Sequence, residues 1–159
     1  MLGLFNDLIE KLKVGECAGR EAIGDRIRVL SEKLRKDSIF EECVHPDDIK
    51  KCYDTFYSNS DMHVGHYFRT LYNIIKYVDQ SDLPSDDEKK MYTNLVRAQL
   101  SSPELELLYF NCLHPVGEKF KPLVERYTLL KHLDREFRKH YLSENFYNIS
   151  AFGIGETSC

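Results

Sequence analysis

Three polar side chains stand close together in the most apolar part of the chain, where they could form a binding groove. Arg97 precedes a Ser-Ser-Pro-Glu corner, Glu104 is the last residue of that corner, and Asn111 follows it. On a helix, Glu104 and Asn111 share one face. A buried carboxylate needs partners, and the Arg97 guanidinium could supply two parallel donors. Alternatively, Glu104 could only cap its own helix while Arg97 lays its apolar stem along the surface and its charge in water. A third interpretation is an ion-pair network that orients the central helices.

A second group of polar residues precedes them in the segment 62–78. His63 and His66 are three residues apart and could bind a metal ion. Protein metal sites of this kind use three or four ligands, and no Glu-x-x-His, third histidine or cysteine pair accompanies these two. We therefore expect no metal site, and no glycine-rich loop indicates a phosphate cofactor. The candidate binding residues are His66, Arg69, Arg97, Glu104 and Asn111.

The elements that must position these residues all have helical periodicity. At the corner, Ser101 or Ser102 can cap a helix, Pro103 fits its first turn, and Glu104 completes a capping box. Apolar stripes with this period predict helices at 2–13, 17–35, 46–57, 62–78, 87–100, 105–113 and from 122 to about 141. The predicted core includes Leu71, Ile75, Leu95, Leu105, Leu108 and Phe110.

The expected fold is all-α, a single-domain helical bundle of about six to seven helices over residues 1–144. A loosely ordered tail is expected over residues 145–159, which contain glycines and no regular pattern. At 159 residues, such a domain buries about 68–70% of the surface that its unfolded chain exposes.

Composition limits the function classes. The formal net charge of −4 argues against a general nucleic-acid-binding surface. The five cysteines are an odd number without a Cys-x-x-Cys pair, which is typical of reduced thiols. No apolar run approaches the 18 residues of a membrane span. These features predict a cytoplasmic protein.

Four segments of the chain carry a family resemblance. They are GREAI at 19–23, GHYFRTLYNIIKYVD at 65–79, YTNLVRAQLSSPELELLYFNCL at 92–113 and GEKFKPLVERYTLLKHL at 117–133. Their order and spacing resemble the putative phage abortive infection family, putAbiC, over roughly residues 17–133. The resemblance implies a bacterial anti-phage role and supplies no catalytic residues. Many members look membrane-anchored through N-terminal hydrophobic spans, which this chain lacks.

A ribonuclease activity is an alternative. Arg135 and His140 have an Arg-x4-His spacing similar to that of HEPN-type ribonucleases, which are helical and frequent in abortive infection systems. His140 could move protons during attack of a 2′-hydroxyl, and Arg135 could stabilise the phosphate charge. Five residues span about 140° around a helix, so both reach one phosphate only in a distorted helix or a dimer. Such a spacing arises easily by chance, and Glu136 adds negative charge.

Whether the protein is an enzyme therefore stays open. We expect first a sensor or protein-interaction module in anti-phage defence, which recognises a phage or host protein and could act with a neighbouring effector. The competing hypothesis is a metal-independent ribonuclease toxin that uses Arg135 and His140. RNA would be a partner only under that alternative. A homodimer is possible under either hypothesis.

Overall fold

A computed structural model describes residues 13–14, 17–18, 21, 24–25, 28–29, 46–59, 62–135, 137–138 and 146–154. Two short strands come first, β1 (Lys13–Val14) and β2 (Cys17–Ala18). The helices are α3 (Pro46–Asn59), α4 (Met62–Gln80), α5 (Asp86–Arg97), α6 (Ser102–Leu113), α7 (Lys121–Arg126) and the 3-10 helix η1 (Ile149–Phe152). The all-α prediction is confirmed, although the described ranges hold five α-helices rather than six to seven.

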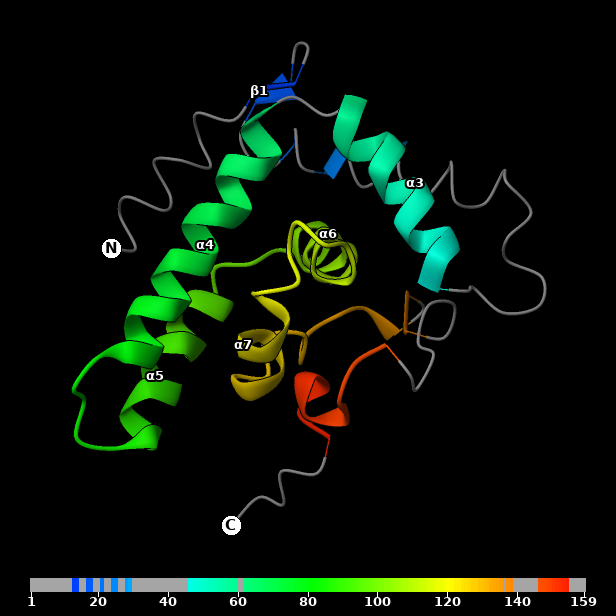
Figure 1. Ribbon diagram of the computed structural model, residues 1–159. Helices are drawn as coiled ribbons and strands as arrows, with labels where there is room; N and C mark the ends of the chain where they lie inside the picture. The colour runs from blue at the N-terminus through cyan, green and yellow to red at the C-terminus, as the bar shows by residue number, and fades with distance from the viewer. Residues whose placement is uncertain are drawn as a thin grey trace.

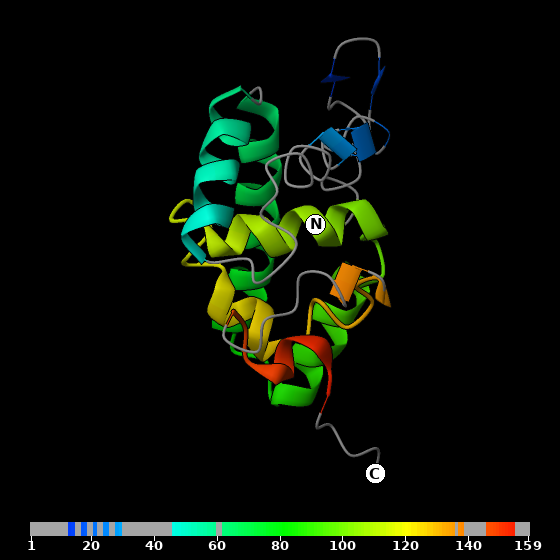
Figure 2. The same ribbon diagram turned by 90° about the vertical axis from the view of Figure 1, so that its right-hand side faces the viewer.

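Helix α6 forms the centre of the core. Figure 1 shows it end-on, with α4 and α3 on either side and α7 and η1 below, and Figure 2 shows it running across α3 and α4. Its residues from Leu107 to Phe110 are fully buried. A helix that is apolar nearly all round is stable only when other elements cover every side. The predicted burial of Leu71, Ile75, Leu105, Leu108 and Phe110 is confirmed.

The predicted burial of Leu95 is wrong, because its side chain is 48% exposed. Helix α5 packs against α4 and buries Thr93 and Val96. A buried stripe through these two residues leaves Leu95 on the outer side of the helix.

The long helix predicted from 122 to about 141 is also wrong, because α7 ends at Arg126. Thr128 has a φ of 52°, in the left-handed region, and a helix cannot continue through it. Two hydrogen bonds from Arg97 hold this turn, one to the Thr128 carbonyl oxygen at 3.1 Å and one to its hydroxyl at 2.7 Å. Leu129 and Leu130 then enter the core.

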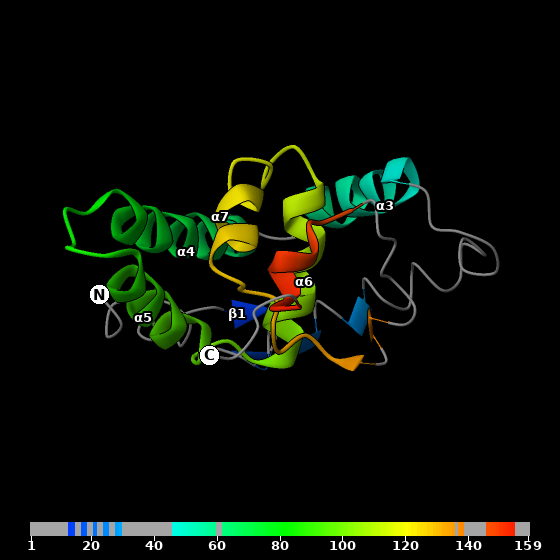
Figure 3. The same ribbon diagram turned by 90° about the horizontal axis from the view of Figure 1, so that it is seen from below.

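The expected loose tail is a packed element over residues 146–154. Tyr147 donates its hydroxyl to the Tyr109 carbonyl oxygen at 2.6 Å, and their rings lie 5.0 Å apart. Leu130 N–H donates to the Ala151 carbonyl oxygen at 3.0 Å. Figure 3, seen from below, places η1 over α6 and beside α7. The prediction is therefore wrong for this stretch, and the rest of the predicted tail lies outside the described residues.

The predicted N-terminal helices need correction at their adjoining ends, although residues 21, 24–25 and 28–29 of the second one are helical. Lys13 pairs with Ala18, and Val14 pairs with Cys17, in an antiparallel ladder. This pairing reverses the chain, so a helix cannot extend through Lys13 or begin at Cys17. The earlier part of the first predicted helix, 2–12, lies outside the described residues. No helix among the described residues combines the length and apolar character that a membrane crossing requires.

Candidate functional site: an aromatic pocket between α3, α4 and α6

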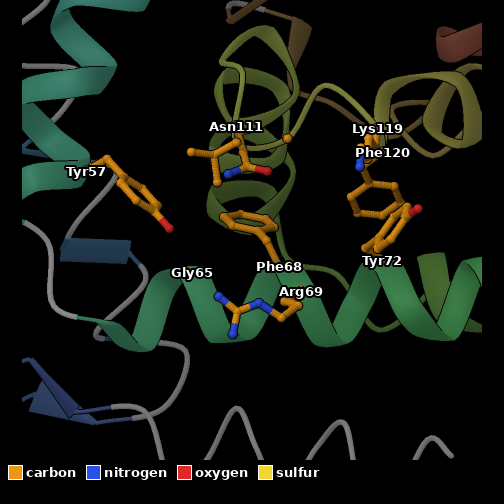
Figure 4. A pocket seen from close by; sticks show the side chains of 10 residues that line it. Tyr57, Gly65, Phe68, Arg69, Tyr72, Asn111, Lys119 and Phe120 are labelled. Carbon is orange, nitrogen blue, oxygen red and sulfur yellow. The ribbon is translucent and has the colours of Figure 1, made fainter.

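A pocket of about 220 Å³ opens between α3, α4, α6 and the turn that follows α6. We call it the aromatic pocket. Its lining residues are Tyr57, Gly65, Phe68, Arg69, Tyr72, Asn111, Val116, Gly117, Lys119 and Phe120. Figure 4 shows Phe68 rising from α4 toward Asn111, with Tyr57 entering from the α3 side.

Four aromatic rings line the pocket, those of Tyr57, Phe68, Tyr72 and Phe120. Phe68 and Tyr72 lie one helical turn apart on α4, so both face the same side. The Tyr72 ring meets Phe120 edge-on with 5.6 Å between ring centroids, a contact visible in Figure 4. Edge-to-face ring pairs at this distance are favourable and orient both rings. The wall is thus a preformed apolar surface.

Glycine at position 65 makes room for the Tyr57 side chain, which comes from α3, to lie against α4. A Cβ at Gly65 would lie 2.7 Å from the Tyr57 hydroxyl oxygen. That separation is shorter than a van der Waals contact, so the Tyr57 side chain would have to shift to admit any larger residue.

Asn111 forms the polar floor of the pocket. Its side chain is buried, and its Nδ2 donates to the Tyr53 hydroxyl at 3.0 Å, which ties α6 to α3. Burial raises the pKa of Tyr53, so its hydroxyl stays protonated at physiological pH. The amide is therefore held in a fixed orientation by a neutral partner.

His114 positions the turn that carries Val116 and Lys119. Its Nδ1 accepts from the Val116 N–H at 3.3 Å, so the ring proton lies on Nε2, 2.6 Å from the Asp54 carboxylate. The ring is buried, while Asp54 is exposed. The backbone of the turn is thereby connected to α3 through one imidazole.

Two cations stand at the edge of the pocket. Arg69 and Lys119 are both exposed and belong to its lining, and Figure 4 places them on α4 and on the opposite turn. None of the described lining residues is acidic. The entrance therefore favours a negatively charged group, and the interior favours an apolar one.

Of the candidate binding residues, Arg69 and Asn111 come together here. His66 lies nearby on α4, where it is exposed and its Nδ1 is 3.3 Å from the Thr70 hydroxyl. It does not belong to the pocket lining. Whether these residues bind anything stays a prediction.

Glu104 and Arg97 occupy other places. Glu104 is fully buried, where it accepts from the Ser101 N–H at 2.7 Å and the Tyr67 hydroxyl at 2.8 Å. The predicted capping box is confirmed. Arg97 reaches Thr128 and lines a second, smaller pocket between α5 and the turn after α7. A single groove containing Arg97, Glu104 and Asn111 was one interpretation of the sequence, and the structure separates Arg97 and Glu104 from the pocket that Asn111 lines.

Of the two residues in the alternative ribonuclease hypothesis, the structure describes only Arg135. Arg135 is exposed on helical backbone, and His140 lies outside the described residues. Within the described ranges, no three His, Cys, Asp or Glu side chains gather as metal ligands would.

Sequence reasoning missed the aromatic lining, including Tyr57 and Phe120. The available signal was glycine at unexpected positions: Gly65 interrupts a clean helical stripe, and Gly117 stands three residues before Phe120. An isolated glycine inside a helical pattern often marks a close approach of another element.

Comparison with known proteins identifies one family. The family model described as "Putative phage abortive infection protein" matches residues 59–138. This range contains every lining residue of the aromatic pocket except Tyr57. No curated protein and no solved structure matches the chain.

Proposed function

Because the chain belongs to the family of putative phage abortive infection proteins, we propose that it is a recognition module of anti-phage defence. Its ligand is a segment of a phage or host protein that binds in the aromatic pocket. The single observation that carries this proposal is the combination of aromatic walls with the Arg69 and Lys119 cations at the entrance.

The chemistry of the pocket defines the ligand. Aromatic walls favour an apolar or aromatic side chain, since burial of such a group contributes about 1.5–3 kcal/mol. Arg69 and Lys119 favour a carboxylate beside it, through charge-assisted hydrogen bonds. The recognised segment therefore carries an apolar anchor residue next to Asp or Glu.

The size of the pocket also supports a peptide side chain. Pockets for drug-sized ligands and cofactors have volumes of about 300–1,000 Å³, and this one has about 220 Å³. One large side chain suits the smaller space. Interfaces obtain most of their affinity from a few such anchors in well-packed pockets.

The pocket is also fixed before a ligand arrives. The Asn111–Tyr53 hydrogen bond and the His114 contacts hold its floor and its turn in place. A pre-organised site loses less conformational entropy on binding than a mobile one. A sensor needs this property to respond to small amounts of its trigger.

The test is a phage challenge of bacteria that express the protein together with its neighbouring genes. Arg69→Ala and Lys119→Ala, singly and combined, should raise the phage yield to that of unprotected cells. Both side chains are exposed, so the thermal midpoint of the purified protein should stay the same. Lys51→Ala removes from the exposed side of α3 the same charge as each single variant and is their matched control; Lys50→Ala combined with Lys51→Ala matches the double variant.

The outcome separates recognition from a purely structural pocket. Loss of protection in the double variant, with protection kept in the control, supports recognition at this pocket. Full protection by the double variant would contradict it, because losing two charge-assisted bonds should weaken binding by at least about tenfold.

A further inference from the structure

The second pocket, which we call the basic pocket, differs in chemistry from the first. It has a volume of about 110 Å³ and lies between α5 and the turn after α7. One wall consists of Lys90, Asn94 and Arg97, and the other includes Arg126, Thr128 and Lys131. Four cations therefore surround one small space in a chain whose net charge is −4.

The α5 wall is a continuous row of donors. Lys90, Asn94 and Arg97 are spaced i, i+4 and i+7, so they lie above one another on the same side of the helix. An ammonium, an amide and a guanidinium donate hydrogen bonds in different geometries, and all of them suit an oxyanion.

On the opposite wall, a strained turn at Thr128 accepts hydrogen bonds from Arg97. Thr128 is a β-branched residue with a φ of 52°, and its hydroxyl and carbonyl oxygen both accept from Arg97. Strained backbone of this kind persists only where the surrounding structure stabilises it. It is concentrated at functional sites. The two hydrogen bonds to Thr128 orient the Arg97 guanidinium at the pocket wall.

Two carboxylates lie near the basic pocket but do not line it. Arg126 donates to Asp79 at 2.9 Å and to Asp86 at 3.3 Å, and the Tyr127 hydroxyl donates to Asp79 at 2.7 Å. Neither aspartate belongs to the described lining of the pocket. The pKa of neighbouring His132 is lowered by partial desolvation and by the positive charges of Arg97, Lys131 and Arg138. Four cations and no carboxylate therefore belong to the described lining of the pocket, although Arg126 is paired with aspartates beside it.

We infer that the basic pocket binds a single phosphate group, either the free ion or the phosphate of a small phosphate ester. Two guanidiniums and two ammoniums supply the donors that phosphate oxygens accept, and the small volume admits one such group. This site is separate from the aromatic pocket, and the inference does not depend on the proposed recognition function.

Calorimetric titration of the full chain tests the inference. Inorganic phosphate, glycerol phosphate and a nucleoside 5′-monophosphate are titrated at constant ionic strength. We expect saturable binding at one site, weakened about tenfold by Lys90→Gln and again by Lys131→Gln. Both lysines are exposed, and glutamine keeps most of each stem. Lys51→Gln on α3 is the matched control and should bind like the unchanged protein.

The outcomes are distinct. Equal affinity for all three ligands assigns the free ion, and tighter binding of the esters assigns a phosphate monoester; both support the site. An absence of saturable binding would overturn it, as would binding that ignores Lys90→Gln and Lys131→Gln. In either case Arg97 and Arg126 would only complement the carbonyl ends of α5 and α7.

Discussion

Gly117 lies directly against Asn111 across the floor of the aromatic pocket. A Cβ at position 117 would stand 2.2 Å from the Asn111 carbonyl oxygen and 2.4 Å from its side-chain Oδ1. Backbone at the end of α6 cannot move away easily, because Asn111 is held by Tyr53 and α6 is packed on every side. The absence of a side chain at 117 therefore decides how closely the turn approaches the helix.

Gly117→Ala should destabilise the protein by about 1–3 kcal/mol, the usual range for overpacking, and should distort the pocket. Gly24→Ala is the comparison, since a Cβ there meets nothing within 4 Å and the residue is helical. Alanine in that helix should leave the stability unchanged or raise it by up to about 1 kcal/mol. Urea denaturation of both variants measures the difference, and equal midpoints would show that the turn can yield at no cost.

Leu108→Ala should lower the free energy of unfolding by about 2–5 kcal/mol, because it opens a cavity at the centre of α6. Leu95→Ala makes the same chemical change on the outer side of α5, where the leucine is 48% exposed. Its effect should stay within about 0.5 kcal/mol. Similar losses for the two variants would be incompatible with the burial of α6 described above.

The hydrogen bond from Tyr67 to Glu104 should be a strong tertiary contact. Tyr67→Phe leaves a buried carboxylate with one donor fewer, and hydrogen bonds to charged groups contribute about 1.5–3 kcal/mol. In a double-mutant cycle with Glu104→Gln, the coupling free energy should exceed about 0.5 kcal/mol. A coupling near zero would reduce Glu104 to a helix cap.

The coupling between Arg97 and Glu104 that the sequence suggested needs its own cycle, with alanine at each position. Arg97 donates to Thr128, whereas Glu104 accepts from Ser101 and Tyr67. We therefore expect this coupling to be smaller than the one between Tyr67 and Glu104.

A ribonuclease and a recognition module respond differently to changes at Arg135 and His140. Under the proposed function, Arg135→Ala and His140→Ala leave phage protection intact, and the purified protein does not cut RNA in the absence of added metal. Metal-independent cleavage that both substitutions abolish, with the fold intact, would establish the ribonuclease instead.

Local signals predicted the middle of the chain well. The Ser-Ser-Pro-Glu corner begins α6 where a capping box and a first-turn proline should place it. Stripes of apolar residues with a 3.6 period identified α3 and α4. These features depend only on residues within one or two helical turns of each other, so they can be predicted from the local sequence.

Features that depend on distant contacts were not predictable in this way. The break at Thr128 is held by Arg97, which lies 31 residues earlier. The 3-10 helix η1 (Ile149–Phe152) has no periodic sequence pattern. The neighbouring Tyr147 is held in place by its contact with the Tyr109 ring on α6. Leu95 follows the apolar pattern, but only the position of α4 decides which side of α5 is covered.

The candidate site was predicted in part for the same reason. Arg69 and Asn111 were identified because a cation and an amide stood on strongly apolar helices. Lys119 and Phe120 come from a turn whose path depends on the Gly117–Asn111 approach and on the His114 contacts. Such a path cannot be inferred from residue types alone.

The hydrogen bond from Tyr147 to the Tyr109 carbonyl has a consequence for biosynthesis. While the ribosome extends the chain, the aromatic side of α6 is complete well before Tyr147 exists to pack against Tyr109. Nascent chains that expose rings in this way are prone to aggregate until the covering segment arrives. Folding of this domain is therefore completed only when residues 146–152 have left the ribosome exit tunnel.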